Sequence, residues 1–301
     1  MGVVGVSPTR RQGPSHRPGC PGIRKGLVCP SVQPKPELFA SDYGAWFQDP
    51  LIVAAYPARP PYPPDVIDVL VSLVPGESRA VLDVGCGTGD IARRLAPRVA
   101  RVDAIDASEA MLAAGRVAEG GDAANLNWMH SRVEDAPLDA AAYGLITAGE
   151  SLHWLEWHAV MPRFARTLVP DGVLAIVDRA WDRPPPLHAR LLPIFKRYSQ
   201  AGTWQNVNLI DELHRRQLFE VLGRQQCGPQ AWQPTMDEYI AARHSQRSFS
   251  RTHMGESRAQ AFDAELRSAI EDACASGEIE RNGDRLRLSV GATVTWGRPR
   301  G

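Results

Sequence analysis

The sequence predicts an α/β fold built on a doubly wound, mostly parallel sheet. Between residues 81 and 178, short apolar runs alternate with segments of helical periodicity, and this alternation is typical of parallel strands joined by right-handed crossovers. The first run, over residues 81–84, is apolar at three of its four positions and leads directly into glycines at alternate positions. A chain of 301 residues is long enough for one or two domains with a large core.

The glycines at positions 85, 87 and 89 predict a binding site for a nucleotide-like cofactor. Glycine allows a positive φ and a close approach between backbone and ligand, and open α/β sheets bind ligands just beyond the carboxyl ends of their strands. Two cofactors fit the spacing. Read from Gly87, the segment has the G-x-G-x-x-A pattern of dinucleotide sites. Read from Gly85, it has the G-x-G-x-G spacing of S-adenosylmethionine (SAM) sites.

Two acidic residues near these glycines are candidate ligand contacts. Asp106 ends the second strand about 20 residues further on, where its two carboxylate oxygens can accept hydrogen bonds from both ribose hydroxyls. Asp83 lies inside an apolar strand, where an unpaired charge is costly. It either accepts hydrogen bonds from loop amides or helps to hold a ligand ammonium group.

The remaining elements of the core follow in order. A helix over residues 65–73 precedes the first strand, and Pro64 suits its start. Next we expect a helix over 91–96, a strand over 102–106, a helix beginning near residue 111, and strands over 126–130, 144–148 and 173–177. The amino terminus of the helix over 91–96 faces the predicted site, where its free amides suit an anionic ligand group.

The segment over residues 181–275 predicts a helical region that covers the substrate, around a sixth strand at 219–223. Helices are expected over 187–200 and 209–218. Two further helices should begin after Thr235, which opens a capping box, and after Ser257, which precedes an apolar face. A last strand over residues 285–298 alternates apolar and polar side chains.

Taken together, the motifs resemble those of the class I SAM-dependent methyltransferases. The resemblance covers residues 56–178 and rests on segments 81–89 (VLDVGCGTG), 105–112 (IDASEAML), 133–137 (VEDAP), 148–154 (AGESLHW) and 166–174 (RTLVPDGVL). It implies a Rossmann-like sheet of seven strands, mostly parallel, with an antiparallel last strand at the far side. It also implies SAM as the cofactor.

The resemblance assigns cofactor-binding roles to nine residues of the core: Asp83, Gly85, Gly87, Asp106, Ala107, Met111, Val133, Glu134 and Gly149. Glu134 is expected to wall the adenine pocket through backbone groups. Arg132 stands where the family often has an acid, and Tyr143-Gly144 replaces another acid before strand four.

The tract from Tyr56 to Pro63 resembles the Tyr-x-x-x-Arg-Pro-Pro-Tyr-Pro segment of a small-molecule methyltransferase subfamily. That likeness implies that Arg59 pairs with the carboxylate of SAM and that Tyr56 walls the methyl group. A rigid polyproline spacer with surface aromatics is the alternative.

Methyl transfer requires alignment more than covalent chemistry, so any catalytic residue is a general base. His153 follows strand four and is the main candidate, either as the base or as a substrate contact; a structural histidine is the third possibility. Tyr43, Glu150 and His244 are weaker candidates. The sequence shows no Cys-His or Ser-His-Asp arrangement for covalent catalysis.

The composition argues against several classes of binding partner. A net charge of +0 argues against nucleic-acid binding, and no apolar run approaches the ~18 residues of a membrane span. The five cysteines are dispersed without a zinc spacing, so we expect no metal site and a location in the reducing cytoplasm.

The sequence divides into a tail and one domain. Residues 1–37 predict a disordered, basic, Pro- and Gly-rich tail. The domain over 38–301 follows, in which residues 38–75 form a lid and first helix and residues 80–180 form the cofactor-binding core. Monomer and homodimer both remain open.

These observations predict a SAM-dependent methyltransferase that acts on oxygen, nitrogen or carbon of a small organic molecule. An NAD-linked oxidoreductase and a SAM-binding protein without methyl transfer are the alternatives from other classes. Methylation of RNA or protein is a third possibility, which the neutral charge disfavours.

Overall fold

The computed structural model describes residues 35–36, 39, 47–76, 79–182, 184–200 and 207–301. The predicted disordered tail over 1–37 and Tyr43 lie outside these residues, apart from positions 35 and 36. Lys35 is half-buried, and its ammonium donates to the carbonyl oxygens of His153 at 3.1 Å and Leu155 at 2.8 Å. We expected packed structure to begin at residue 38, but it already includes Lys35.

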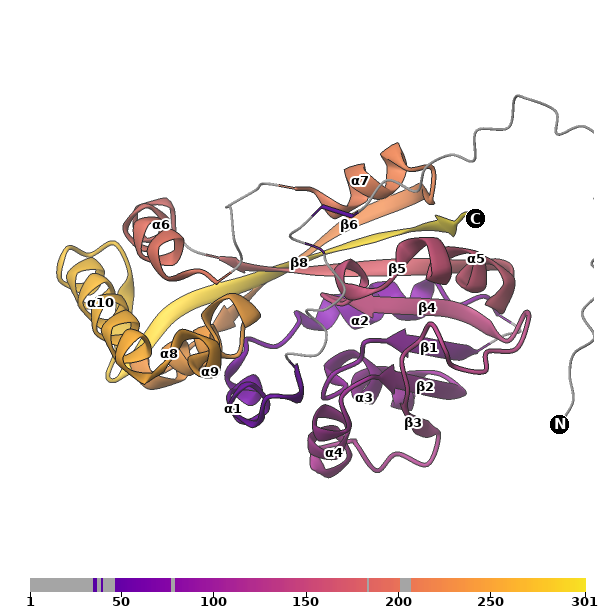
Figure 1. Cartoon of the computed structure of the whole chain (residues 1–301), viewed down its shortest axis with the longest axis horizontal. Helices are drawn as coiled ribbons and strands as arrows, with labels where there is room; N and C mark the ends of the chain where they lie inside the picture. Colours follow the sequence, from indigo (N-terminus) through magenta and orange to yellow (C-terminus); the bar gives the residue numbers. More distant parts are fainter. Residues whose placement is uncertain (1–34, 37–38, 40–46, 77–78, 183, 201–206) are drawn as a thin grey trace, which may run out of the picture. The chain divides into compact units, whose positions relative to one another are not determined.

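A single mixed sheet organises the chain, in the order β3-β2-β1-β4-β5-β8-β6 (Figure 1). Five strands are parallel: β1 (Ala80–Val84), β2 (Arg101–Asp106), β3 (Leu126–His130), β4 (Tyr143–Gly149) and β5 (Leu168–Asp182). The last strand, β8 (Arg285–Pro299), runs antiparallel between β5 and β6 (Phe219–Trp232). The prediction of a mostly parallel sheet with an antiparallel last strand is confirmed. The predicted count of seven strands omits the short β7 (Glu280–Asn282), which pairs with β8.

Helices occupy the connections that the alternating pattern predicted. In the core these are α1 (Pro50–Ala55), α2 (Pro64–Ser72), α3 (Asp90–Leu95), α4 (Glu109–Val117) and α5 (Trp157–Thr167). The later helices are α6 (Pro185–Tyr198), α7 (Leu209–Arg215), α8 (Met236–His244), α9 (Arg251–Met254) and α10 (Glu256–Ala275). Short 3-10 turns cover Tyr56–Ala58 (η3), Ala96–Arg98 (η4), Leu152–Trp154 (η5) and Arg247–Phe249 (η6).

The central strand β1 is buried on both faces, as its apolar run predicted. Val81, Leu82 and Val84 are each 0 % exposed, and β1 pairs in parallel with β2 and β4. Parallel strands covered by helices on both faces need this continuous apolar character. The turn after β1 therefore lies at the middle of the carboxyl edge of the sheet, beside the ends of β2 and β4.

Two strands are much longer than their apolar runs indicated. We expected strands over 173–177 and 219–223, but β5 and β6 extend to Asp182 and Trp232 and pair with β8 along their length. Figure 1 shows these strands reaching away from the core to α6, α8, α9 and α10. Polar residues on the exposed face of β6 interrupt the apolar pattern, which is why the sequence underestimates its length.

The helical region has a hydrophobic core of its own. Phe262, Leu266, Ile270 and Ala273 of α10 are each 0 % exposed, which confirms the predicted apolar face. They belong to one buried cluster with residues of α6 and α8. The capping box at Thr235 is also confirmed, since its side chain accepts from the Glu238 N–H and the Glu238 carboxylate accepts from the Thr235 N–H. Among the described residues, no helix combines the length and apolarity that crossing a membrane requires.

Truncation of Phe262 tests whether this second core contributes to global stability. Phe262 stacks on Phe249 with ring centroids 5.1 Å apart, so Phe262→Ala leaves a cavity that the long strands cannot close. We expect the free energy of unfolding to fall by ~3–5 kcal/mol in urea titrations. Val117→Ala is the control, because Val117 is 88 % exposed on α4. Equal effects from the two substitutions would contradict a well-packed second core.

Candidate functional site

The turn after β1 has a backbone that only glycine adopts without strain. Gly85 and Gly87 have φ values of 62° and 57°, in the left-handed region. A Cβ on Gly87 would lie 3.3 Å from the Tyr56 hydroxyl, and a Cβ on Gly85 would lie 2.5 Å from Cβ of Ser151. Both glycines are therefore required by the local packing as well as by the turn.

Asp106 ties this turn to the end of β2. Its Oδ2 accepts a hydrogen bond from the Gly87 N–H at 2.8 Å, and its Oδ1 accepts one from the Ser108 N–H at 2.8 Å. Burial raises the pKa of the Asp106 carboxyl, and these two hydrogen bonds offset part of that rise. The Ala107 N–H also lowers the pKa of this carboxyl, and the carboxylate oxygens still have lone pairs that can accept hydrogen bonds from a ligand.

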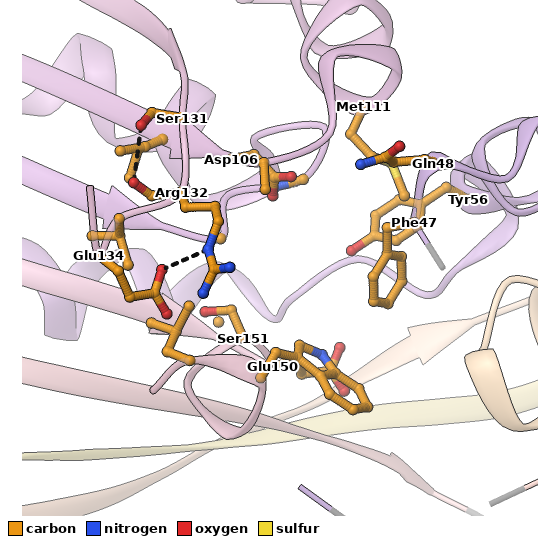
Figure 2. A pocket seen from close by; sticks show the side chains of 18 of the residues that line it. Phe47, Gln48, Tyr56, Asp106, Met111, Ser131, Arg132, Glu134, Glu150 and Ser151 are labelled. Atoms are coloured by element: carbon orange, nitrogen blue, oxygen red, sulfur yellow. Dashed lines mark hydrogen bonds and ion pairs between the residues drawn. The ribbon is translucent and has the colours of Figure 1, made fainter. Parts of the chain in front are cut away.

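A cavity of about 370 Å³ lies beside Asp106. In Figure 2, Phe47 and Tyr56 lie across this cavity from Ser131 and Glu134. Ten of the predicted cofactor residues line it: Tyr56, Arg59, Gly85, Gly87, Asp106, Ala107, Met111, Val133, Glu134 and Gly149. Its volume lies within the range of small-molecule sites.

A second cavity of about 320 Å³ continues from the first. The two share four lining residues, Tyr56, Arg59, Gly85 and Gly149. The second cavity extends to Asp83, Tyr62, Asp90 and Arg179. The two cavities therefore form one cleft over the carboxyl ends of β1, β2 and β4, which is where the sequence placed the cofactor.

Asp83 accepts hydrogen bonds from protein groups in the interior of the sheet. Its side chain is in β1, where the Thr147 hydroxyl donates to Oδ1 at 2.7 Å and the Ala92 N–H donates a further hydrogen bond. Burial raises the pKa of Asp83 to about 7, against the opposing effect of these two donors. These donors lie on β4 and α3 and not in the glycine loop. Asp83 also lines the second cavity, so a contact with a ligand ammonium group stays a prediction.

Tyr56 and Arg59 are packed into the cleft wall. The Arg59 guanidinium lies 4.3 Å from the Tyr56 ring centroid, and it donates from Nε to Ser245 Oγ at 2.9 Å and from Nη2 to the Ser245 carbonyl at 2.7 Å. A spacer with surface aromatics does not fit this arrangement, because both residues line both cavities. Arg59 is thus anchored from the helical region, through a contact that the sequence did not reveal.

Glu150 and Arg179 also line the cleft. Glu150 was only a weaker candidate from the sequence, and Arg179 was not predicted. Glu150 follows β4 with a φ of 50°, a strained value for a non-glycine residue. Its Oε2 lies 3.5 Å from Arg179 Nε and 3.8 Å from Arg59 Nη1. The Arg179 side chain is 4 % exposed and lies over the Tyr62 ring at 4.0 Å. These charges come from elements far apart in the chain, so no local motif indicates the cluster.

The segment after β3 walls the larger cavity. The Glu134 carboxylate accepts from the Glu156 N–H at 3.0 Å and lies 3.6 Å from Arg132 Nε (Figure 2). The Glu134 side chain is thus held by protein groups, and a contact between its backbone and the adenine stays a prediction. Arg132, the departure from the family pattern, also lines the cavity.

His153 does not line either cavity. Its ring packs between Phe39 and Trp154, with centroid distances of 6.0 Å and 4.2 Å. Burial, followed by the positive charges of Lys35, Arg59 and Arg247, lowers the pKa of His153 to about 3. A neutral, weakly basic ring outside the cleft agrees with a structural histidine and does not support a general base or a substrate contact. His244, a weaker candidate, is also outside the two cavities and contacts Asp263.

Comparisons with known proteins identify the type of domain. Residues 81–172 match the family described as Methyltransferase domain. An uncharacterized methyltransferase of Mycobacterium tuberculosis is 36 % identical over 126 residues, which are 42 % of this chain and 49 % of that protein. A trans-aconitate 2-methyltransferase of Azoarcus sp. is 36 % identical over 121 residues, 39 % of this chain and 46 % of that protein. The chain thus spans about half the length of the curated relatives that it matches.

The fold has relatives among solved structures. A putative type II methyltransferase from Anaeromyxobacter dehalogenans superposes with a TM-score of 0.56 at 20 % identity, over 80 % of this chain and 99 % of that one. The Rossmann-like fold is therefore confirmed. The family match confirms a methyltransferase domain over residues 81–172, in agreement with the SAM interpretation of the glycine motif over the dinucleotide one.

The raised pKa of Asp83 predicts a pH dependence of stability. Between about pH 4 and the native pKa of about 7, the unfolded state has released the proton that the native state retains. The free energy of unfolding therefore falls as pH rises through this window. In urea titrations we expect Asp83→Asn to remove this part of the slope, so that wild type loses stability relative to the variant as pH rises. The exposed Asp122 serves as control, since Asp122→Asn should leave the slope unchanged. A difference between Asp83→Asn and wild type that is independent of pH would rule out the assignment.

Proposed function

We propose that this chain, whose residues 81–172 match a methyltransferase domain, is a SAM-dependent methyltransferase that acts on a small organic molecule. The observation that carries the proposal is the position of Asp106. Its carboxylate ends β2, lines the larger cavity and is tied to the glycine turn after β1. This is the arrangement that a nucleoside with two free ribose hydroxyls requires.

The residues present fit SAM in one orientation. Asp106 receives the ribose, and Met111, Val133 and the backbone of Glu134 surround the adenine in the larger cavity. The amino-acid end extends into the second cavity, towards Arg59 and Arg179. Arg179 Nε is buried and makes no hydrogen bond among the described residues, although Glu150 Oε2 lies 3.5 Å away as its ion-pair partner. A ligand carboxylate there would supply the hydrogen bond that this donor lacks.

The chain contributes alignment to the reaction. When bound, SAM supplies a methyl group on a sulfonium: a lone pair of the acceptor forms the new bond, and the electrons of the broken C–S bond stay on sulfur. Orientation of two reactants can supply ~7–11 kcal/mol of the barrier. With His153 outside the cleft, alignment and exclusion of water by the cleft walls are the main contributions of the described residues.

Two observations support a small acceptor. The chain has a net charge of +0, which disfavours a nucleic-acid substrate, and the proposed reaction centre lies inside a cleft of a few hundred Å³. The helical region over 181–275 was expected to recognise the substrate. None of its described residues lines either cavity, and it reaches the cleft through the bonds from Arg59 to Ser245.

The cofactor assignment predicts a ligand-dependent gain in stability that requires Asp106. We expect S-adenosylhomocysteine (SAH), the demethylated product, to raise the melting temperature of wild type, because it binds only the folded state. Asp106→Ala should abolish this shift, whereas Asp122→Ala, at an exposed acid, should keep it. Differential scanning fluorimetry with SAH and with NAD distinguishes the two cofactor classes. A shift with NAD and none with SAH would contradict the proposal.

A further inference from the structure

Several residues that line the larger cavity have no role in holding the cofactor. If Asp106 marks the ribose and Arg179 the amino-acid end, the sulfur lies between them, beside the residues that the two cavities share. Among the lining residues that this orientation leaves without a role, Phe47 and Trp154 are the two large aromatic side chains, and Glu150 follows β4 beside the shared residue Gly149. These residues have no part in holding the cofactor in the orientation proposed above.

Phe47 and Trp154 form an aromatic corner. Their ring centroids are 6.3 Å apart with the planes at 62°, so the two rings meet edge to face and form two walls at an angle. Both are held from behind. The Ser108 hydroxyl donates to the Phe47 carbonyl oxygen at 2.8 Å, and the His153 ring packs against Trp154 at 4.2 Å. A rigid aromatic corner suits a flat apolar ligand.

Glu150 supplies one hydrogen-bond acceptor beside the corner. Arg59 and Arg179 both approach its Oε2, and Oε1 has no partner among the described residues. Its side chain is 27 % exposed, so Oε1 is available to a ligand in the cavity. The two arginines hold the carboxylate in place, and carboxylate oxygens accept hydrogen bonds.

We propose that Phe47, Trp154 and Glu150 form the acceptor subsite, and that the acceptor is an aromatic molecule that carries a hydroxyl or amino group. Its ring packs in the corner, and its O–H or N–H donates to Glu150 Oε1. On methyl transfer the oxygen or nitrogen forms the new bond to carbon, the electrons of the C–S bond stay on sulfur, and the proton that the acceptor loses passes to Glu150 Oε1. This inference rests on the proposed methyltransferase function and adds the substrate class. A carboxylate substrate would instead meet the like charge of Glu150, and the two nearby arginines, Arg59 and Arg179, would already face both Glu150 and the carboxylate of SAM.

The test is SAH release by the full chain with SAM and two matched acceptor sets. One set contains phenols and anilines, and the other contains small dicarboxylic acids of similar size. We expect turnover with the first set. Trp154→Leu should raise the KM for the best ring acceptor by about 10-fold or more, and Trp154→Phe by less. Glu150→Gln should weaken the binding of rings that carry a hydroxyl or amino group. The binding of the same rings methylated at that group should change less, with both sets measured as inhibitors.

SAH binding, measured by calorimetry on each variant, separates this inference from the function on which it rests. A Kd for SAH within twofold of the wild-type value shows that the fold and the cofactor site of a variant are intact. A change in KM then reflects binding of the acceptor. Turnover of dicarboxylic acids, absence of turnover with every ring acceptor, or an unchanged KM in Trp154→Leu would overturn the acceptor assignment while SAH still binds. No SAH binding by wild type would overturn the proposed function itself, and this inference with it.

Discussion

The hydrogen bonds that Asp106 accepts from the Gly87 and Ser108 N–H groups are the constraint on which the cleft depends. They join the turn after β1 to the end of β2, and Ser108 in turn donates to the Phe47 carbonyl oxygen. One short network thus sets the distance between the glycine turn, the proposed ribose site and the N-terminal wall. Because the carboxylate is buried, losing either donor would leave it poorly solvated as well as loosening the turn.

A second network holds the opposite side of the cleft at some cost to the fold. Glu150 keeps a left-handed backbone, and Arg179 is almost completely buried beside it. Strained backbone and buried charge both lower stability, and they persist where the surroundings require them. Here the surroundings include the helical region, which holds Arg59 through Ser245. The helical region therefore contacts the wall of the proposed cofactor site through Ser245 and Arg59.

The sequence predicted the parts of the molecule that depend on local pattern. Apolar runs, glycines at alternate positions and an acid at the end of β2 are all readable within about 30 residues, and the structure brings ten of the eleven predicted cofactor residues to the larger cavity. It did not predict groupings across distant elements. Glu150, Arg179 and Ser245 meet Arg59 only in the folded chain, and the direction of the His153 ring depends on Phe39 and Trp154. The lengths of β5 and β6 were missed because polar residues interrupt their apolar pattern.

The central claim is that Asp106 binds the ribose of a SAM-derived ligand while remaining bonded to the Gly87 amide. A crystal structure of the full chain with SAH tests it most directly. The account predicts both ribose hydroxyls within hydrogen-bond distance of the Asp106 carboxylate, at about 2.5–3.0 Å, and the amino-acid carboxylate beside Arg179. A ligand bound elsewhere on the sheet edge, or a ribose that contacts no oxygen of Asp106, would contradict it.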